Sequence, residues 1–138
     1  MPPTVLSRLE LSIKTEDDVV TVRSKAREIA ERLGFDAFAT AAIVTATSEL
    51  ARNAWRHAGG GTAFLMAIDQ SGRTGLRLDV DDTGPGIVDL ERALAGGNST
   101  LRSLGLGLAG SRRLADEFDI SSTVSKGTHV SFTKWKRR

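Results

Sequence analysis

The sequence predicts an α+β fold in which helices cover one face of a mixed, mostly antiparallel sheet. Strand-like patterns occur near the start, in the middle and at the end of the chain, whereas two helical patterns follow one another between residues 15 and 59. Runs of strands with a pair of helices on one side are typical of this fold class. At 138 residues the chain has the length of one compact domain, so we expect residues 1–138 to share a single core.

The N-terminal half predicts one strand and two helices. Residues 9–13 alternate apolar and polar side chains, which is the period of a half-buried strand. Thr15 then precedes three acidic residues, as at a helix N-terminus, and Gly34 follows the last apolar residue of the helical pattern. Asp36 predicts the start of a second helix, and the glycines at 59–61 predict its end.

The middle of the chain predicts a hairpin and a long loop. Two strands, residues 63–68 and 76–80, are separated by a turn-rich stretch at 70–75. Residues 83–104 are rich in glycine and weakly patterned. We therefore expect mobility there, above all at 96–100, where no apolar stripe is present to pack.

The last third predicts one more helix followed by two strands. One face of the helix is formed by small and apolar residues, namely Gly107, Gly110, Leu114 and Phe118. Strands at 120–124 and 128–132 flank a turn at Lys126-Gly127.

The composition argues against several classes of function. The chain has no cysteine, which removes disulfides, thiolate catalysis and cysteine-bound zinc, and its two histidines are too few for an obvious metal cluster. A net charge of +2 and the absence of tyrosine disfavour a nucleic-acid-binding surface. No apolar run approaches the roughly 20 residues of a membrane span, and the N-terminus lacks a signal-peptide pattern. We therefore expect a cytoplasmic protein with no membrane contact.

Asp82 is the most informative carboxylate of the sequence. Apolar and polar side chains alternate along residues 76–82, so Asp82 shares the inward face with Val80. A buried carboxylate is costly unless it is hydrogen-bonded, and an external donor such as the exocyclic amine of adenine would satisfy it. Gly84 and Gly86 would let the backbone approach a flat ring closely. The alternative is that Asp82 caps a turn.

The final strand places a second polar group on an apolar sheet face. Thr128 shares its face with Val130 and Phe132, so its hydroxyl is expected to point inward. Two polar groups on strands that are distant in sequence predict one polar spot in an apolar pocket. The alternative is an ordinary strand threonine whose hydroxyl is satisfied within the chain.

The second predicted helix carries Glu49 and Asn53, which are four residues apart and project from one face. An amide oxygen suits a hard cation such as magnesium, and a carboxylate suits the role of proton acceptor. The alternative is a solvated polar helix face.

Residues 105–110 match the pattern G-x-G-x-x-G. The context of a dinucleotide-binding fold is missing, because a polar loop rather than a strand precedes the motif. Glycines ahead of a helix still expose backbone N–H groups at its positive end, where phosphates bind. The alternative is a packing surface made of small residues.

Four short motifs occur in order along the chain: Glu49-Leu-Ala-Arg-Asn53, Asp82-Thr-Gly-Pro-Gly86, Gly105-Leu-Gly-Leu108 and Gly127-Thr128. Together they resemble the N box, G1 box, G2 box and trailing threonine of the GHKL family of ATP-binding proteins, which implies a Bergerat-type two-layer sandwich. The resemblance covers about residues 10–136. Because this domain is nearly the whole chain, the resemblance favours the stand-alone kinases of the RsbW/SpoIIAB anti-sigma type and the RsbT type. The stretches 46–53, 104–114, 116–120 and 134–135 resemble the RsbT-type switch kinases in particular.

The resemblance assigns roles to individual residues. It implies that Glu49 is the general base toward the substrate hydroxyl and that Asn53 binds Mg²⁺. Asp82 and Thr128 would recognise the adenine of ATP. Further nucleotide contacts would come from small and apolar residues of the two glycine-containing motifs, Gly84, Gly86, Gly105, Leu106, Gly107 and Leu108. Residues 96–107 would form a lid over ATP.

The resemblance also implies an ATP-dependent serine/threonine protein kinase. Its substrate would be a STAS-domain protein, and the released kinase would bind and activate a PP2C-type phosphatase. Two alternatives stay open: an anti-sigma kinase that acts by sequestering a sigma factor, and a nucleotide-gated adaptor that binds ATP without transferring its phosphate.

Overall fold

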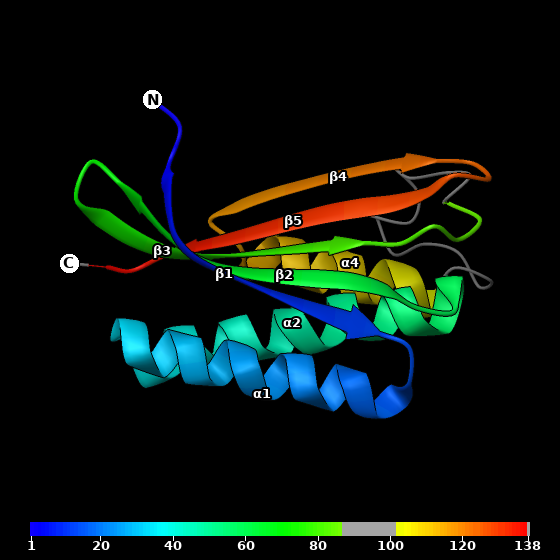
Figure 1. Ribbon diagram of the computed structural model, residues 1–138, viewed down its shortest axis with the longest axis horizontal. Helices are drawn as coiled ribbons and strands as arrows, with labels where there is room; N and C mark the ends of the chain where they lie inside the picture. The colour runs from blue at the N-terminus through cyan, green and yellow to red at the C-terminus, as the bar shows by residue number, and fades with distance from the viewer. Residues whose placement is uncertain (87–101, 138) are drawn as a thin grey trace.

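The computed structural model describes residues 1–86 and 102–137, without the side chains of residues 102–106. In chain order the described elements are β1 (Thr4–Ile13), α1 (Glu16–Leu33), α2 (Ala37–Ala58), β2 (Gly61–Gln70), β3 (Arg73–Asp81), α4 (Arg102–Leu114), β4 (Glu117–Thr123) and β5 (Gly127–Trp135). The described strands form one sheet in the order β1-β2-β3-β5-β4, and each neighbouring pair is antiparallel. The described helices lie together on one face of this sheet (Figure 1), which confirms the predicted two-layer α+β fold.

Both long helices begin and end where the sequence predicts. The hydroxyl of Thr15 accepts a hydrogen bond from the N–H of Asp18 at 3.2 Å, and the Asp18 carboxylate accepts one from the N–H of Thr15 at 3.0 Å. This reciprocal pair is a capping box for α1. Asp36 caps α2 by accepting a bond from a backbone N–H of its first turn at 2.7 Å. Gly34 and Gly59 end the helices with φ values of 85° and 76°, which favour glycine.

The hairpin between β2 and β3 is tighter than predicted. Gln70 pairs with Arg73, so the turn contains only Ser71 and Gly72. Both turn residues have positive φ, 54° and 79°, which matches the twist of the flanking strands and closes a hairpin in two residues. The expected turn over residues 70–75 was therefore wrong, because the strands extend farther into it.

The last helix ends before Phe118, which the sequence had placed on its face. α4 ends at Leu114, and Phe118 lies in β4 opposite Phe132 of β5. The carboxylate of Asp116 accepts a hydrogen bond from the N–H of Trp135 at 2.7 Å, which ties the chain to β5 directly after α4. The four-residue spacing between Leu114 and Phe118 is also that of a helical face. The hydrogen bond from Trp135 to Asp116, which joins residues distant in sequence, fixes the start of β4 instead.

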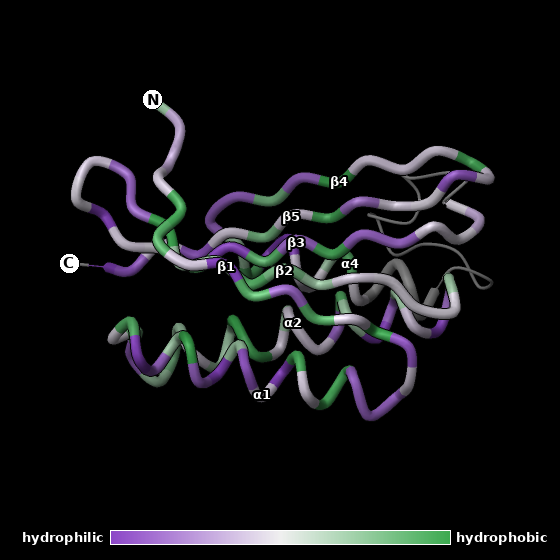
Figure 2. Tube along the Cα trace, in the orientation of Figure 1, coloured by the Kyte–Doolittle hydropathy of each residue, from purple (hydrophilic) through white to green (hydrophobic). Residues whose placement is uncertain are grey.

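The main core lies between the sheet and the helices. Leu65, Leu78 and Phe132 of the central strands are fully buried there. Apolar residues recur between polar ones along α1 and α2 (Figure 2), as expected for helices that pack one face on a sheet. No described helix is both long enough and apolar enough to cross a membrane.

The other face of the sheet carries a smaller apolar cluster, formed by Phe64, Met66, Ile68 and Trp135. Two guanidinium groups cover its aromatic rings. Arg8 lies 4.3 Å from the centroid of the Phe64 ring, and Arg73 lies 4.0 Å from that of Trp135, both within cation–π range. This cluster extends the packed part of the molecule to the end of β5.

Candidate active site

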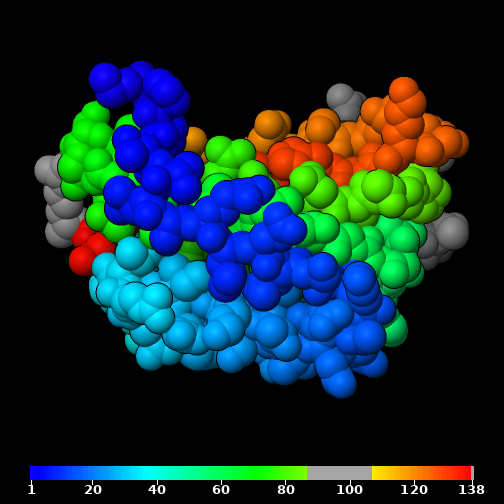
Figure 3. All heavy atoms as spheres, in the orientation of Figure 1, coloured from blue at the N-terminus to red at the C-terminus, as the bar shows by residue number. Residues whose placement is uncertain are grey.

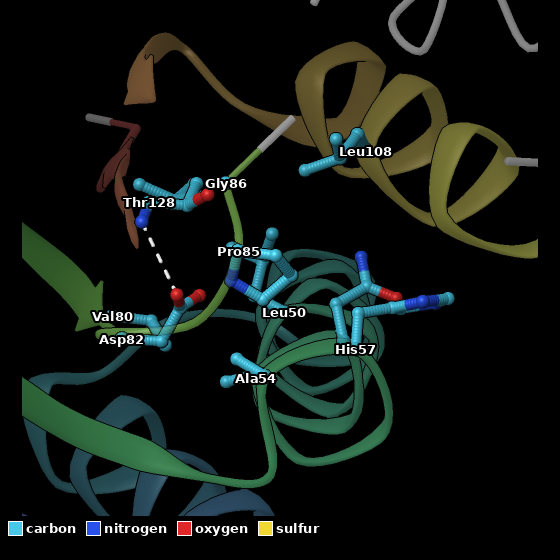
Figure 4. Close-up of a pocket in the computed structure, with 12 residues that line it drawn as sticks. Leu50, Ala54, His57, Val80, Asp82, Pro85, Gly86, Leu108 and Thr128 are labelled. Carbon is cyan, nitrogen blue, oxygen red and sulfur yellow. Dashed lines mark hydrogen bonds between the residues drawn. The ribbon is translucent and has the colours of Figure 1, made fainter. Parts of the chain in front are cut away.

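A mostly apolar pocket lies between the second half of α2, the end of β3, the start of β5, and α4 (Figure 4). Its volume is about 140 Å³. Much of the wall is apolar and comes from all of these elements: Leu50, Ala54, Val80, Leu108 and Val130. Four polar side chains reach the same pocket, those of Asn53, His57, Asp82 and Thr128. An apolar pocket with a few convergent polar groups is the usual form of a site for a small organic molecule.

Asp82 follows β3 and faces the pocket, as the strand period predicts (Figure 4). Its Oδ1 accepts hydrogen bonds from the backbone N–H groups of Gly84 at 3.0 Å and Thr128 at 3.2 Å. Within the described residues no donor hydrogen-bonds its Oδ2. Both interpretations of the sequence therefore hold in part: one carboxylate oxygen caps a turn, and the other retains its capacity for an external donor.

Close packing within the chain explains why glycine occupies positions 84 and 86. A Cβ on Gly84 would lie 2.4 Å from the Cβ of Ala58, and one on Gly86 would lie 2.5 Å from the carbonyl oxygen of Thr123. Gly86 also has a φ of 77°. Close approach of α2 and of the β4 end therefore requires glycine at these positions, whether or not a ligand ring also approaches them.

Thr128 reaches the pocket from the start of β5. Its backbone N–H binds Asp82, and its hydroxyl lies 2.9 Å from the hydroxyl of Ser122 on β4. The hydroxyl is therefore hydrogen-bonded within the sheet, as expected if Thr128 is an ordinary strand threonine. Its role toward adenine stays a prediction, because a hydroxyl can both donate and accept.

Glu49, Asn53 and His57 form a stripe along α2, which we call the α2 stripe, because they are spaced four residues apart. The Nδ2 of Asn53 and the Nε2 of His57 are buried and have no hydrogen-bond partner among the described residues. Buried polar atoms without partners are rare in folded proteins and are frequently satisfied by a ligand or ion. The α2 stripe thus presents buried hydrogen-bonding groups to the pocket.

Glu49 lies beside the pocket at one end of the α2 stripe. Its Oε1 accepts a hydrogen bond from the guanidinium of Arg52 at 2.8 Å. Its Oε2 is close to α4, because a Cβ on Gly107 would lie 3.0 Å from this oxygen and 3.1 Å from the Nδ2 of Asn53. Glycine at position 107 therefore allows α4 to approach both functional side chains closely.

The structure changes the expected role of the last glycine motif. The phosphate-binding interpretation takes Gly105 and Gly107 to lie ahead of a helix, but both lie inside α4, as the sequence also predicts for Gly107 on the helix face. The N–H of Gly105 falls among the first four of the helix, which have no partner within it, whereas the N–H of Gly107 does not. The first part of the predicted lid, residues 96–101, and the side chain of Leu106 lie outside the described residues.

His57 is a pocket residue that the sequence reasoning missed. Burial, and secondarily the charge of Arg56, lowers the pKa of the His57 imidazole below its ordinary value. The ring is therefore neutral near pH 7, with one nitrogen as donor and the other as acceptor. The signal that could have found it was its spacing, four residues after Asn53 on the same helix.

Comparisons with known proteins show the family of the chain. Residues 13–134 match the family described as the histidine kinase-like ATPase domain, and the chain belongs to this family. It is 42% identical over 125 residues to the serine/threonine-protein kinase RsbT of Bacillus subtilis (strain 168). The match covers 91% of this chain and 94% of that relative. Within the family, the chain therefore falls among the RsbT-type serine/threonine-protein kinases.

Solved structures share the fold. The RsbU and RsbW domains of Rv1364c from Mycobacterium tuberculosis match with a TM-score of 0.64 and 25% identity. That match covers 100% of this chain and 34% of the other, so this chain spans about a third of that protein's length. The SiaB–SiaC complex from Pseudomonas aeruginosa matches with a TM-score of 0.58, over 95% of this chain and 90% of the other. At 12% identity, it shows the fold alone.

Proposed function

We propose that this kinase transfers the γ-phosphate of Mg-ATP to a serine or threonine of a STAS-domain protein. Once released from that protein, it binds and activates a PP2C-type phosphatase in the cytoplasm. The observation that carries the proposal is the combination, in one pocket, of a backbone-anchored carboxylate with a free oxygen and buried polar atoms that lack partners. The relation to RsbT supports the reaction type and the partner-switching role.

At the base-recognising end, Asp82 is held by two backbone N–H groups, so its free oxygen is fixed in position before any ligand arrives. A carboxylate oxygen accepts hydrogen bonds only, which selects a base that offers an amine at this position. Adenine has such an amine, whereas guanine carries a carbonyl there. Val80 and Val130 supply apolar surface beside the carboxylate for the ring.

At the reacting end, the α2 stripe supplies the remaining groups. When bound, Mg-ATP supplies the transferable phosphoryl group and the metal charge that neutralises it. The side-chain oxygen of Asn53 would hold the metal, and its buried Nδ2 would donate a hydrogen bond to an acceptor on the ligand. Glu49 would accept the proton of the substrate hydroxyl, since Arg52 engages one oxygen and orients the carboxylate.

Two other functions are compatible with the same pocket. An anti-sigma kinase of the RsbW type would use the same chemistry but would bind a sigma factor as its output partner. An adaptor would bind ATP without transferring its phosphate. The relation to a serine/threonine-protein kinase favours the catalytic alternatives over the adaptor.

The test uses γ-labelled ATP, magnesium and purified candidate STAS-domain proteins. We expect label on a serine or threonine of one of them, with the wild-type kinase and not with the Glu49→Ala variant. Pull-downs with the PP2C-type phosphatase and the sigma factor then distinguish the two switch types. ATP binding without any labelled protein would leave the adaptor as the function.

A further inference from the structure

A second surface lies at the end of α2 that is remote from the pocket. Phe38, in the first turn of α2, is 87% exposed, which makes it the most exposed large apolar side chain in any described helix or strand. Phe38 and His57 are nineteen residues apart on one helix, which corresponds to about 28 Å along its axis. Figures 1 and 3 show the start of α2 beside the C-terminal residues, at the end of the molecule away from the pocket.

A groove runs beside Phe38, between the α1–α2 corner and the end of β5. We call it the distal groove. Its lining includes the buried residues Phe35 and Trp135, although the ring of Trp135 lies under Arg73. Three cationic side chains also line it, those of Lys134, Lys136 and Arg137. Apolar and cationic groups therefore converge on one concave surface.

Of the cations that line the distal groove, Lys134 pairs with Asp116 and donates to the carbonyl of Leu114 at 2.8 Å, whereas Lys136 and Arg137 are not paired with the acids near them. Asp36 already caps α2, and Asp116 already accepts a backbone bond and pairs with Lys134 at 3.8 Å. Lys136 and Arg137 are exposed and form no ion pair with any described residue.

The rim of the groove is held in place by the fold. The backbone N–H of Lys136 donates to the carbonyl of Thr74 at 2.8 Å, which continues the pairing of β5 with β3. The ammonium of Lys136 also lies close to the end of α1, since a Cβ on Gly34 would be 2.9 Å from it. A surface that is ordered before binding loses less entropy when a partner docks.

We propose that the distal groove docks an acidic segment of a partner protein, which packs one apolar side chain against Phe38. Charge complementarity selects the acidic residues, and the exposed ring supplies the apolar contact. A lipid surface is the weaker match, because membrane-binding helices present a whole apolar face rather than one side chain. This docking is separate from the proposed phosphotransfer, which uses the other end of α2.

The probe is a fluorescent peptide with four glutamates on each side of a central leucine, and fluorescence anisotropy measures its binding. We expect affinity that falls with salt, and a loss of about tenfold or more in Phe38→Ala, since an exposed phenylalanine gains most of its apolar burial from the partner. The double variant Lys136→Glu, Arg137→Glu should abolish binding. ATP affinity should be unchanged in both variants, which separates this inference from the proposed kinase reaction.

A matched control reverses two exposed arginines elsewhere, in Arg112→Glu, Arg113→Glu on α4. This control should retain most of the peptide affinity. The inference is overturned if the wild type does not bind the peptide, or if the control loses as much affinity as the groove variant, which would mean non-specific attraction to a basic protein. It is also overturned if an all-glutamate peptide binds equally well, or if vesicles with anionic lipids bind tightly and lose this binding in Phe38→Ala.

Discussion

The two ends of the pocket differ in how their polar side chains are held in place. Asp82 is placed by backbone hydrogen bonds from Gly84 and from Thr128, which is 46 residues away in sequence. Asn53 and His57 instead project from a regular helix, and their buried Nδ2 and Nε2 atoms have no hydrogen-bond partner among the described residues. The chain therefore fixes the position of the Asp82 carboxylate and leaves one oxygen for an external donor, whereas the α2 stripe carries buried nitrogen atoms that no described residue satisfies. Changes at the stripe should affect catalysis and ligand-dependent stability, and changes at Asp82 should affect the choice of base.

The largest expected effect is at Glu49. Glu49→Ala should lower the rate of phosphotransfer to a STAS-domain protein by about a hundred- to ten-thousand-fold, because it removes the general base. Binding of Mg-ATP should persist. Glu31→Ala, which removes an exposed acid of α1, is the control and should retain activity. Normal phosphotransfer by Glu49→Ala would mean that Glu49 takes no part in the reaction and that another group accepts the proton.

A smaller effect is expected at Asn53. Asn53→Ala should weaken magnesium-dependent ATP binding roughly ten- to hundredfold, since a methyl group cannot replace an amide that serves a charged ligand. Calorimetry with and without magnesium measures the effect. If the variant binds ATP equally in both conditions and as tightly as the wild type, the amide does not hold the metal. Circular dichroism excludes loss of folding as the cause.

The smallest expected effect is that of His57 on the pH dependence of stability. Burial lowers the pKa of its imidazole in the folded state, so the unfolded state, with a pKa near 6.5, binds the proton more readily. Stability should therefore fall as the pH decreases below about 6.5, and His57→Gln, which cannot be protonated, should reduce this slope. Urea unfolding between pH 5 and about 8 provides the measurement. Equal slopes in the two proteins would show that the buried ring does not disfavour protonation.

The sequence predicts the local parts of this fold well. Caps at Thr15 and Asp36 and glycines at 34 and 59 fix the ends of both long helices. Each of these signals depends only on residues within a few positions along the chain. The strand period also places Asp82 at the pocket. These features depend on neighbours in sequence, which a pattern can reveal.

Features decided by distant contacts escape the same reasoning. Phe118 fits a helical spacing after Leu114, yet the bond between Asp116 and Trp135 places it in a strand. The partner of the Asp82 carboxylate on β5 and the unpartnered ring of His57 emerge only when the elements pack together. Sequence patterns likewise left open whether Gly107 donates a free N–H or packs closely, and its place inside α4 beside Glu49 and Asn53 favours packing.

The central claim is that the free oxygen of Asp82 selects adenine in a kinase pocket. Calorimetry of ATP and GTP binding, in the wild type and in Asp82→Asn, tests it most directly. The account predicts tight binding of ATP, weak or absent binding of GTP, and a loss of about 1.5–3 kcal/mol of ATP affinity in the variant. Equal affinity for ATP and GTP in the wild type, or unchanged ATP affinity in Asp82→Asn, would contradict it.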